Sequence, residues 1–387
     1  MINNHVKTDG GKLPSAVGTV YSPTPAWSYS HHPHIAFFRG RFFAAWSSGK
    51  ANEDDRGQRV MLAHSPDGLH WEGHHHVATP DMLGDATLVL TAAGFHVHGD
   101  TLYLYFGAFG YAEDALQADG TRPQADASHR DTNLYYVSTT DGENWEAPVP
   151  LGLAMVPNHG PQATRSGRLI ISGNVAFPYT DSPDGVSGYR MTGVYGDCFG
   201  GGTIVDDSDS IHRVTAHQGW EASLICEGSF YQTDDGVLHM LMRSNSPRLW
   251  TSESLDDGAH WSAPTPTEYT DDGSKFHLGR LPDGRFYCVS NAIHGGKRCP
   301  LELFLSRNGE DFDHRYVLRD EYFDQVYPGM YKLGMYGYPH TLIRDGYLYV
   351  IYSKRKEGVE VTRVALSELD QNFGSSDNES KSTKTNK

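Results

Sequence analysis

The chain of 387 residues has a formal net charge of −16 at pH 7, and 38% of its residues are hydrophobic, which suits a globular protein with a sizeable core. Because it has no basic stripe to neutralise phosphates, nucleic acid is excluded as a partner. The chain has no run of eighteen apolar residues and no signal peptide at Met1, so we expect no membrane partner and a cytoplasmic or processed secreted protein.

Six segments along the chain have the pattern of a β-hairpin: an apolar run, a turn that contains Gly, and a second apolar run. Successive turn glycines are separated by 59, 68, 69, 48 and 62 residues, which suits four-stranded units with insertions. In chain order the segments are Ile35–Trp46, Phe95–Phe106, Ala163–Gly173, Tyr231–Arg243, Leu281–Asn291 and Leu342–Ser353.

A short phrase also recurs, in which Ser or Thr is followed by Asp or Asn, then by Gly, and then by an aromatic residue. Its polar side chains can bond backbone amides and its Gly supplies a positive φ, so the phrase is expected to fold a turn rather than a catalytic site. Degenerate copies lie at Ser367–Phe373 and near Asp206–Asp209. The clear copies begin at Ser65, Thr139, Ser254 and Ser306 and end at Trp71, Trp145, Trp261 and Phe312.

These repeats predict an all-β fold: a six-bladed β-propeller of four-stranded antiparallel blades, or a seven-bladed one if an insertion hides a blade. We expect one propeller domain over residues 1–373 and a disordered polar tail over residues 374–387. The polar segments Tyr111–Arg130 and Tyr179–Gly202 interrupt the repeat, and we expect them to form long loops over one face.

In a propeller, the first strand of each hairpin starts, and its partner ends, at one mouth of the central channel. Equivalent positions at these strand ends hold residue types that transfer protons or hold a carboxylate. Their coincidence predicts a functional site at this mouth. The residues at the strand starts are His31, His32, His159, Glu227, Lys275, His277 and Tyr338, and those at the strand ends are Asn174, Arg243 and Asn291.

The four cysteines show no pairing pattern. A structural metal held by Cys288, His294 and Cys299 is one interpretation, but their spacing fits no familiar zinc signature. Buried free thiols are the favoured interpretation. We therefore expect that the protein requires no cofactor.

The turn phrases resemble the Asp-boxes of the sialidase superfamily, and the order of hairpins is similar to that family over nearly the whole chain. The stretch from Glu227 to Arg243 is similar to the sialidase blade that supplies a Glu and an Arg. The stretch Tyr336–His340 is similar to the blade that carries the Tyr nucleophile, which such a Glu activates. The resemblance implies an enzyme that cleaves glycans.

The chain departs from the sialidase pattern in its arginines. His31-His32-Pro33 stands where sialidases place the first Arg, and only Arg243 and Arg280 are candidates for the usual three. A site with His in place of Arg resembles, more distantly, the propeller ulvan lyases and rhamnose–glucuronate lyases.

From these residues we predict cleavage of a uronate-containing glycan by β-elimination. Arg243 would neutralise the carboxylate of the uronate, and His159 or His32 would take the C5 proton. Tyr338 would protonate the leaving oxygen. The residues left to bind the acidic oligo- or polysaccharide are His31, Asn174, Lys275, His277, Arg280, Asn291, Tyr336 and His340.

Two alternatives remain open. A sialidase-like exo-hydrolase would use Tyr338 or Tyr336 as its nucleophile and Glu227 as the base, with Asp85 or an Asp within Tyr111–Arg130 as the acid. A non-catalytic propeller would bind glycans at the same mouth through Tyr, Trp and His. A saturated product favours hydrolysis over elimination, and affinity without cleavage favours binding alone.

Overall fold

The computed structural model describes residues 1–112, 116–117, 121, 129–194, 212–217 and 220–370. In this part of the chain the regular structure is β-strand apart from two short 3₁₀ helices, Pro80–Leu83 and Leu366–Glu368. Neither helix has the length or the apolar character that crossing a bilayer requires. The predicted all-β class is therefore confirmed.

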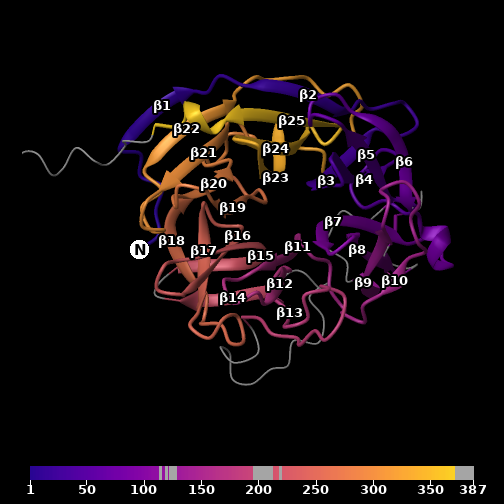
Figure 1. Cartoon of the computed structure of the whole chain (residues 1–387), viewed down its shortest axis with the longest axis horizontal. Helices are drawn as coiled ribbons and strands as arrows, with labels where there is room; N and C mark the ends of the chain where they lie inside the picture. The colour runs from indigo at the N-terminus through magenta and orange to yellow at the C-terminus, as the bar shows by residue number, and fades with distance from the viewer. Residues whose placement is uncertain (113–115, 118–120, 122–128, 195–211, 218–219, 371–387) are drawn as a thin grey trace, which may run out of the picture.

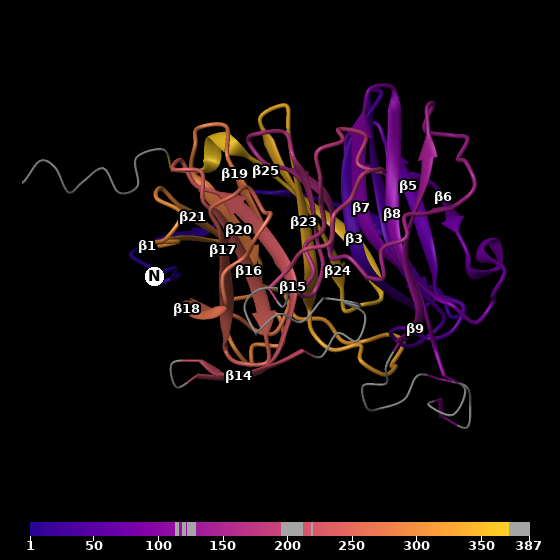
Figure 2. The same ribbon diagram turned by 90° about the horizontal axis from the view of Figure 1, so that it is seen from below.

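The strands of the described residues form six sheets, which Figure 1 shows side by side around a central axis. Figure 2 shows that the strands stand steeply to the plane of this ring. The first sheet contains β3 (Tyr29–Phe38), β4 (Arg41–Gly49), β5 (Arg59–Ser65) and β6 (Glu72–Ala78). The second contains β7 (Val89–His98), β8 (Thr101–Tyr111), β9 (His129–Thr139) and β10 (Val149–Pro150). The third contains β11 (His159–Ala163), β12 (Leu169–Ser172) and β13 (Tyr179–Thr180).

The other three sheets are built from the second half of the chain and from its first strands. The fourth contains β14 (His212–His217), β15 (Trp220–Gln232), β16 (Leu238–Ser244), β17 (Arg248–Ser254) and β18 (Thr265–Thr270). The fifth contains β19 (His277–Arg280), β20 (Phe286–Ser290), β21 (Leu301–Ser306), β22 (His314–Arg319) and β1 (Thr8–Lys12). The sixth contains β23 (Tyr336–Arg344), β24 (Tyr347–Lys354), β25 (Gly358–Ala365) and β2 (Ala16–Tyr21).

All six predicted hairpins are present as antiparallel pairs, β3–β4, β7–β8, β11–β12, β15–β16, β19–β20 and β23–β24. The number of strands per sheet differs from the prediction, because only three of the six sheets have four strands in the described residues. One reason is that the N-terminal β1 joins the fifth sheet, where it pairs in parallel with β22. The other N-terminal strand, β2, pairs with β25 and so joins the first strands of the chain to its last sheet.

Each of the four clear copies of the turn phrase begins at the last residue of a strand and leads into the next strand of the same sheet. The strand pairs are β5 and β6, β9 and β10, β17 and β18, and β21 and β22. In the first copy, the Ser65 hydroxyl accepts hydrogen bonds from the backbone N–H of Gly68 at 2.8 Å and of Asp67 at 3.3 Å. Asp67 in turn accepts the N–H groups of Leu69 and His70 at 2.9 Å each. The predicted structural role is therefore confirmed for these copies. The degenerate copy near Asp206–Asp209, and the end of the copy at Ser367–Phe373, lie outside the described residues.

Strands in the middle of a sheet are buried on both faces, because neighbouring sheets pack on either side of them. In β4 every residue after Arg41 is buried. One core cluster joins β4 and β5 to β8, and another joins β20 and β21 to β24. Most of the predicted loop Tyr111–Arg130, part of Tyr179–Gly202 and the whole predicted tail 374–387 lie outside the described residues.

Candidate functional site

Three inner strands carry a β-bulge where the predicted site residues lie. The pairing register shifts in β3, β15 and β23, and one residue within each shift has a left-handed φ: 52° at His32, 56° at Glu227 and 57° at Tyr338. Such a φ costs a residue other than Gly about 1–3 kcal/mol. A bulge re-aims a side chain, and here it brings Tyr338 against both His32 and Glu227.

Tyr338, Glu227 and Arg243 form one hydrogen-bonded group. The Tyr338 hydroxyl donates to Oε1 of Glu227 in a short hydrogen bond. Arg243, opposite Cys226 in the β15–β16 pair, donates from Nη1 to Oε2 of Glu227 at 2.7 Å and to the Tyr338 hydroxyl at 3.1 Å. The three side chains come from the fourth and sixth sheets, so the ring brings together residues that are far apart in sequence.

The charges in this group are set by burial and by the ion pair. Burial, followed by the Glu227 charge, raises the pKa of Tyr338 well above its ordinary value, so the phenol keeps its proton. Burial acts to raise the pKa of Glu227 as well, but the Arg243 charge and the hydrogen bonds from Arg243 and Tyr338 outweigh it and lower that pKa. The site therefore holds a neutral phenol against an ionised carboxylate.

Further cations surround the Tyr338 ring. The distances from its centroid are 5.4 Å to the Arg298 guanidinium, 5.8 Å to Lys275 Nζ and 5.9 Å to Lys356 Nζ. Burial lowers the pKa of Lys356 to about 8 and that of Lys275 to about 7. The sequence analysis missed Arg298, which lies in the β20–β21 connection, because that position has no equivalent in the other hairpins. It also missed Lys356, which lies two residues beyond the end of β24.

On the other side of Tyr338 lie His31, His32 and Glu53. The ring centroids of His31 and His32 lie 3.8 and 5.0 Å from that of Tyr338. The Glu53 carboxylate pairs with Lys356 Nζ at 2.7 Å, accepts the Tyr29 hydroxyl at 3.2 Å and lies 3.9 Å from His31 Nε2. Glu53 was not predicted, because it follows β4 in a segment with no repeat pattern.

A second layer of four buried or nearly buried histidines lies on the inner strands β3, β11, β19 and β23. It consists of His34, His159, His277 and His340, whose neighbouring ring centroids are 4.4 to 6.0 Å apart. Lys275 joins the two layers, since its Nζ lies 3.2 Å from His34 Nε2 and also donates to the Asn158 carbonyl. The pKa of each of the four rings is lowered, chiefly by burial and also by nearby cationic groups.

The remaining predicted site residues have other places. The Asn174 side chain accepts the backbone N–H of Glu227 at 3.2 Å, so it supports the bulge. Asn291 donates to the carbonyl of Arg298 at 3.1 Å and so holds the loop that carries this cation. The Tyr336 hydroxyl donates to the Glu321 carboxylate at 2.8 Å, and its ring packs in the core between the fifth and sixth sheets. It lies away from Tyr338, because the bulge breaks the alternation of side chains between the two faces of β23.

Arg280 is not brought to this group. It lies at the far end of β19, where it pairs with Asp234 at 2.8 Å and donates to the Gly284 carbonyl. Arg280, which was predicted to bind substrate as a second candidate arginine, therefore lies at the opposite end of β19 from His277. Asp85, considered as an acid, accepts the Thr87 hydroxyl at 2.6 Å and lies 3.8 Å from Arg130. The aspartates within Tyr111–Arg130 lie outside the described residues.

Two groups of histidines and carboxylates in the described residues are close enough to hold a metal ion: His159, His277 and His340, and His31, His32 and Glu53. Neither includes the predicted trio of Cys288, His294 and Cys299. The three described cysteines are buried free thiols, as the sequence favoured, and His294 Nδ1 lies 3.1 Å from the Asp271 carbonyl.

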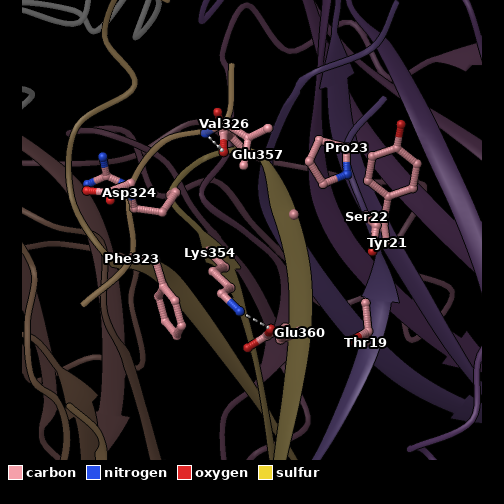
Figure 3. Close-up of a pocket in the computed structure, with 12 residues that line it drawn as sticks. Thr19, Tyr21, Ser22, Pro23, Phe323, Asp324, Val326, Lys354, Glu357 and Glu360 are labelled. Carbon is pink, nitrogen blue, oxygen red and sulfur yellow. Dashed lines mark hydrogen bonds and ion pairs between the residues drawn. The ribbon is translucent and has the colours of Figure 1, made fainter. Parts of the chain in front are cut away.

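A separate pocket of 340 Å³ lies beside β2 and β25 (Figure 3). Lys354 pairs with Glu360 across it at 2.7 Å, and the N–H of Val326 donates to Glu357 at 3.1 Å. It shares no lining residue with the Tyr338 group, and it holds no hydroxyl bonded to a base comparable to the Tyr338–Glu227 pair.

Comparison with known proteins gives one family and a set of similar folds. A family model described as a BNR repeat-like domain matches residues 40–350. No curated protein sequence matches the chain. A crystal structure of a protein of unknown function from Dyadobacter fermentans is similar at a TM-score of 0.63 and 14% identity, over 90% of this chain and 97% of that one.

Two sialidases are similar in fold. Trypanosoma rangeli sialidase, solved with 2,3-difluorosialic acid as a covalent intermediate, matches at a TM-score of 0.63 and 12% identity, over 92% of this chain and 60% of that one. A mutant of NanB sialidase from Streptococcus pneumoniae matches at 0.62 and 11%, over 91% of this chain and 71% of that one. At these identities the similarity shows the fold alone.

Proposed function

We propose that this chain, which belongs to the family of BNR repeat-like domains in the sialidase superfamily, is a glycoside hydrolase that releases an acidic sugar. The observation that carries the proposal is the contact of the Tyr338 hydroxyl with both the Glu227 carboxylate and the Arg243 guanidinium. A hydroxyl bonded to a buried base is the arrangement of an activated nucleophile.

In the first step, the Tyr338 oxygen attacks the anomeric carbon and its proton passes to Glu227, while the leaving oxygen takes a proton from a second group. Water then attacks the anomeric carbon from the face that the leaving group vacated, opposite to Tyr338, and gives a proton to the second group, while Glu227 returns its proton to the Tyr338 oxygen. Two inversions retain the configuration. A neutral phenol suits an acidic sugar, because the substrate's own carboxylate would repel a carboxylate nucleophile. Arg243 stabilises the negative charge that Glu227 and Tyr338 share before the attack.

The substrate carboxylate is bound by the cations around the Tyr338 ring. Arg298, Lys275 and Lys356 supply positive charge from three different places in the fifth and sixth sheets. They take the place of the arginine cluster that the sequence lacks. The Glu53 carboxylate lies beside His31 and Lys356. We assign it the proton transfer to the leaving oxygen. The bound anion competes for the Lys356 ammonium and so weakens the Glu53–Lys356 ion pair, which lets Glu53 take up the proton that it transfers.

The geometry supports hydrolysis better than β-elimination. His159, a candidate base for elimination, lies in the second histidine layer, where its Nε2 is 3.3 Å from the carbonyl of Phe276. His32 contacts Tyr338, but burial lowers its pKa to about 3, which makes it a weak base. Hydrolysis by the Tyr338–Glu227 pair removes no proton from C5, so it needs no base at that position.

The covalent intermediate supplies a direct test. Incubation with a 2,3-difluoro acidic glycosyl fluoride should add one sugar mass to the peptide that contains Tyr338, because the second fluorine slows the release of the intermediate. Tyr338→Phe should abolish the label and the turnover. Tyr336→Phe is the matched control, because this tyrosine is two residues away but packs in the core, and it should keep the label.

The products of unlabelled substrates separate the three functions. A panel of sialosides, uronides and uronate polysaccharides should give a saturated sugar whose mass includes one added water. An unsaturated product with ultraviolet absorbance would overturn hydrolysis and establish elimination. Affinity without any product, together with no label on Tyr338, would leave a binding protein.

The same proposal treats the chain as one propeller domain of six blades, one for each sheet of the described residues. The pairing of β2 with β25 supports this interpretation, because it joins the two ends of the ring.

A further inference from the structure

Three histidines from three different sheets meet near the ring axis, next to the Tyr338 group. They are His159 on β11, His277 on β19 and His340 on β23, and each offers a ligand atom that lies within 4.8 Å of the other two. Their ring centroids are 4.8, 5.8 and 4.4 Å apart. Figure 1 shows these three strands on different sides of the ring centre, so only ring closure brings the side chains together.

The nitrogens of His159 and His277 are arranged as in a ligand set, and His340 Nδ1 accepts the backbone N–H of Ile35 at 3.4 Å. His159 is 1% exposed, and its Nδ1 has no hydrogen-bond partner, while its Nε2 lies 3.3 Å from the Phe276 carbonyl. His277 is held through Nδ1 by the Thr341 hydroxyl at 2.7 Å, which directs Nε2 toward the cluster. Metal-binding histidines commonly fix one ring nitrogen on an oxygen in this way, so that the other nitrogen presents its lone pair.

A fourth polar group is available at the same place. The amide nitrogen of Gln162, also on β11, lies 3.5 Å from His277 Nε2, and its amide oxygen is buried with no hydrogen-bond partner. A half-turn of the amide exchanges the two atoms. It would direct an oxygen ligand to the point that the three imidazoles share.

We propose that His159, His277 and His340 bind one divalent transition-metal ion, with zinc as the ion of first choice and Gln162 as a fourth ligand. Imidazole nitrogens suit zinc, copper, nickel and iron, whereas magnesium and calcium prefer oxygen. A tetrahedral zinc site with bonds of about 2.0–2.1 Å places its nitrogens roughly 3.4 Å apart. The ligand atoms lie within 4.8 Å of one another, so the rings approach one another where a pair is farther apart than that tetrahedral spacing.

The contacts of the neighbouring groups favour His159, His277 and His340 as the metal ligands over the other nearby histidines and carboxylates. His34 is already engaged at both nitrogens: Nδ1 donates to the His32 carbonyl at 3.1 Å, and Nε2 accepts from Lys275 Nζ, which lies 3.2 Å away. The other group of potential ligands, His31, His32 and Glu53, lies among the cations of the Tyr338 site, and its carboxylate is paired with Lys356.

The ion would tie the third, fifth and sixth sheets together at the axis, close to the layer that holds Tyr338. Its role is then to fix the inner strands that position the site. The proposal does not depend on the hydrolytic function, because it concerns residues that take no part in the transfer to Tyr338.

The test measures metal on the full chain. Protein stripped with a chelator and dialysed should bind one equivalent of Zn²⁺ by titration calorimetry and elemental analysis, and its thermal midpoint should rise with Zn²⁺. Co²⁺ in its place should give the visible absorption of a tetrahedral site with nitrogen ligands. His277→Ala and His340→Ala should each weaken Zn²⁺ binding by at least 10-fold and remove the Co²⁺ spectrum.

Two controls keep the result interpretable. His75→Ala, on the exposed outer strand β6, should leave the stoichiometry unchanged. Circular dichroism of the apo variants separates loss of metal from loss of fold, and Gln162→Leu should alter the Co²⁺ spectrum without unfolding the chain. The proposal is overturned if no stoichiometric metal binds, if folded His277→Ala retains full affinity, or if affinity is lost instead in Glu53→Gln.

Discussion

At the scale of single residues, the site depends on backbone strain. The bulges of β3, β15 and β23 each hold a residue other than Gly with a left-handed φ, and these residues, His32, Glu227 and Tyr338, belong to the predicted set. Strain of this kind persists only where the surroundings enforce it. The ion pair with Arg243 and the hydrogen bond from the Glu227 backbone N–H to Asn174 supply that enforcement at Glu227.

Glu227→Gln should lower kcat by about 10²–10⁴-fold, the contribution typical of a positioned general base. The variant keeps the size of the side chain, so substrate affinity should change far less than kcat. The wild-type rate should fall at acidic pH as Glu227 takes up a proton, below the ordinary carboxyl pKa because its pKa is lowered. Steady-state kinetics over pH check both points. An unchanged kcat would remove Glu227 from the mechanism.

Asp271 gives a pH effect on stability that is separate from activity. Burial raises its pKa from 3.8 to about 7. In the folded protein the proton is held more tightly than in the unfolded chain, so this group stabilises the fold below pH 3.8 and loses that contribution as pH rises toward about 7. Asp271→Asn should therefore gain stability relative to the wild type across this window.

Denaturant unfolding of both proteins at several pH values measures that difference. Asp100→Asn, at a side chain 92% exposed, is the control and should follow the wild type. A constant difference between Asp271→Asn and the wild type would show that the carboxyl of Asp271 is ionised throughout.

At the scale of the elements, each turn phrase stabilises its own turn. In the second sheet the Thr139 hydroxyl accepts the N–H of Gly142 at 2.9 Å and that of Asp141 at 3.3 Å, and it donates to the Asp141 carboxylate at 3.0 Å. The hydroxyl is buried, so its removal leaves donors without partners.

Thr139→Val should lower the free energy of unfolding by about 1–3 kcal/mol, the cost of an unsatisfied buried donor. Thr139→Ser restores the hydroxyl and should recover most of the loss. Both variants should keep the wild-type kcat, because the turn is remote from Tyr338. Chemical denaturation together with the activity assay checks this. Loss of activity without loss of stability would contradict the structural role.

At the scale of the whole molecule, the ring is joined where the first strands of the chain meet its last sheet. Gly18 on β2 pairs with Val361 on β25 and packs against the turn phrase of the first sheet. A Cβ at Gly18 would meet the Leu69 carbonyl oxygen at 2.3 Å, and the next nearest atoms are also backbone. This contact therefore joins the first sheet to the sixth.

Gly18→Ala should destabilise the fold by about 1–3 kcal/mol through overpacking, because no flexible side chain can move aside. Val17→Ala, at a residue 45% exposed, is the adjacent control and should change stability little. Thermal unfolding of both variants makes the comparison. Equal midpoints for Gly18→Ala and the wild type would show that β2 does not join the ring.

The sequence by itself determined the local structure: six hairpins and four turn phrases, because period-two apolar runs and Gly-containing turns act over a few residues. Tertiary structure decided everything that depends on ring closure. The pairing of Tyr338 with Glu227, the cations Arg298 and Lys356, and the meeting of His159, His277 and His340 join distant segments. Local pattern carries no information on which strand end or face meets which neighbour. The places of the proposed binding residues Arg280, paired with Asp234, and Tyr336, bonded to Glu321, could therefore not be predicted.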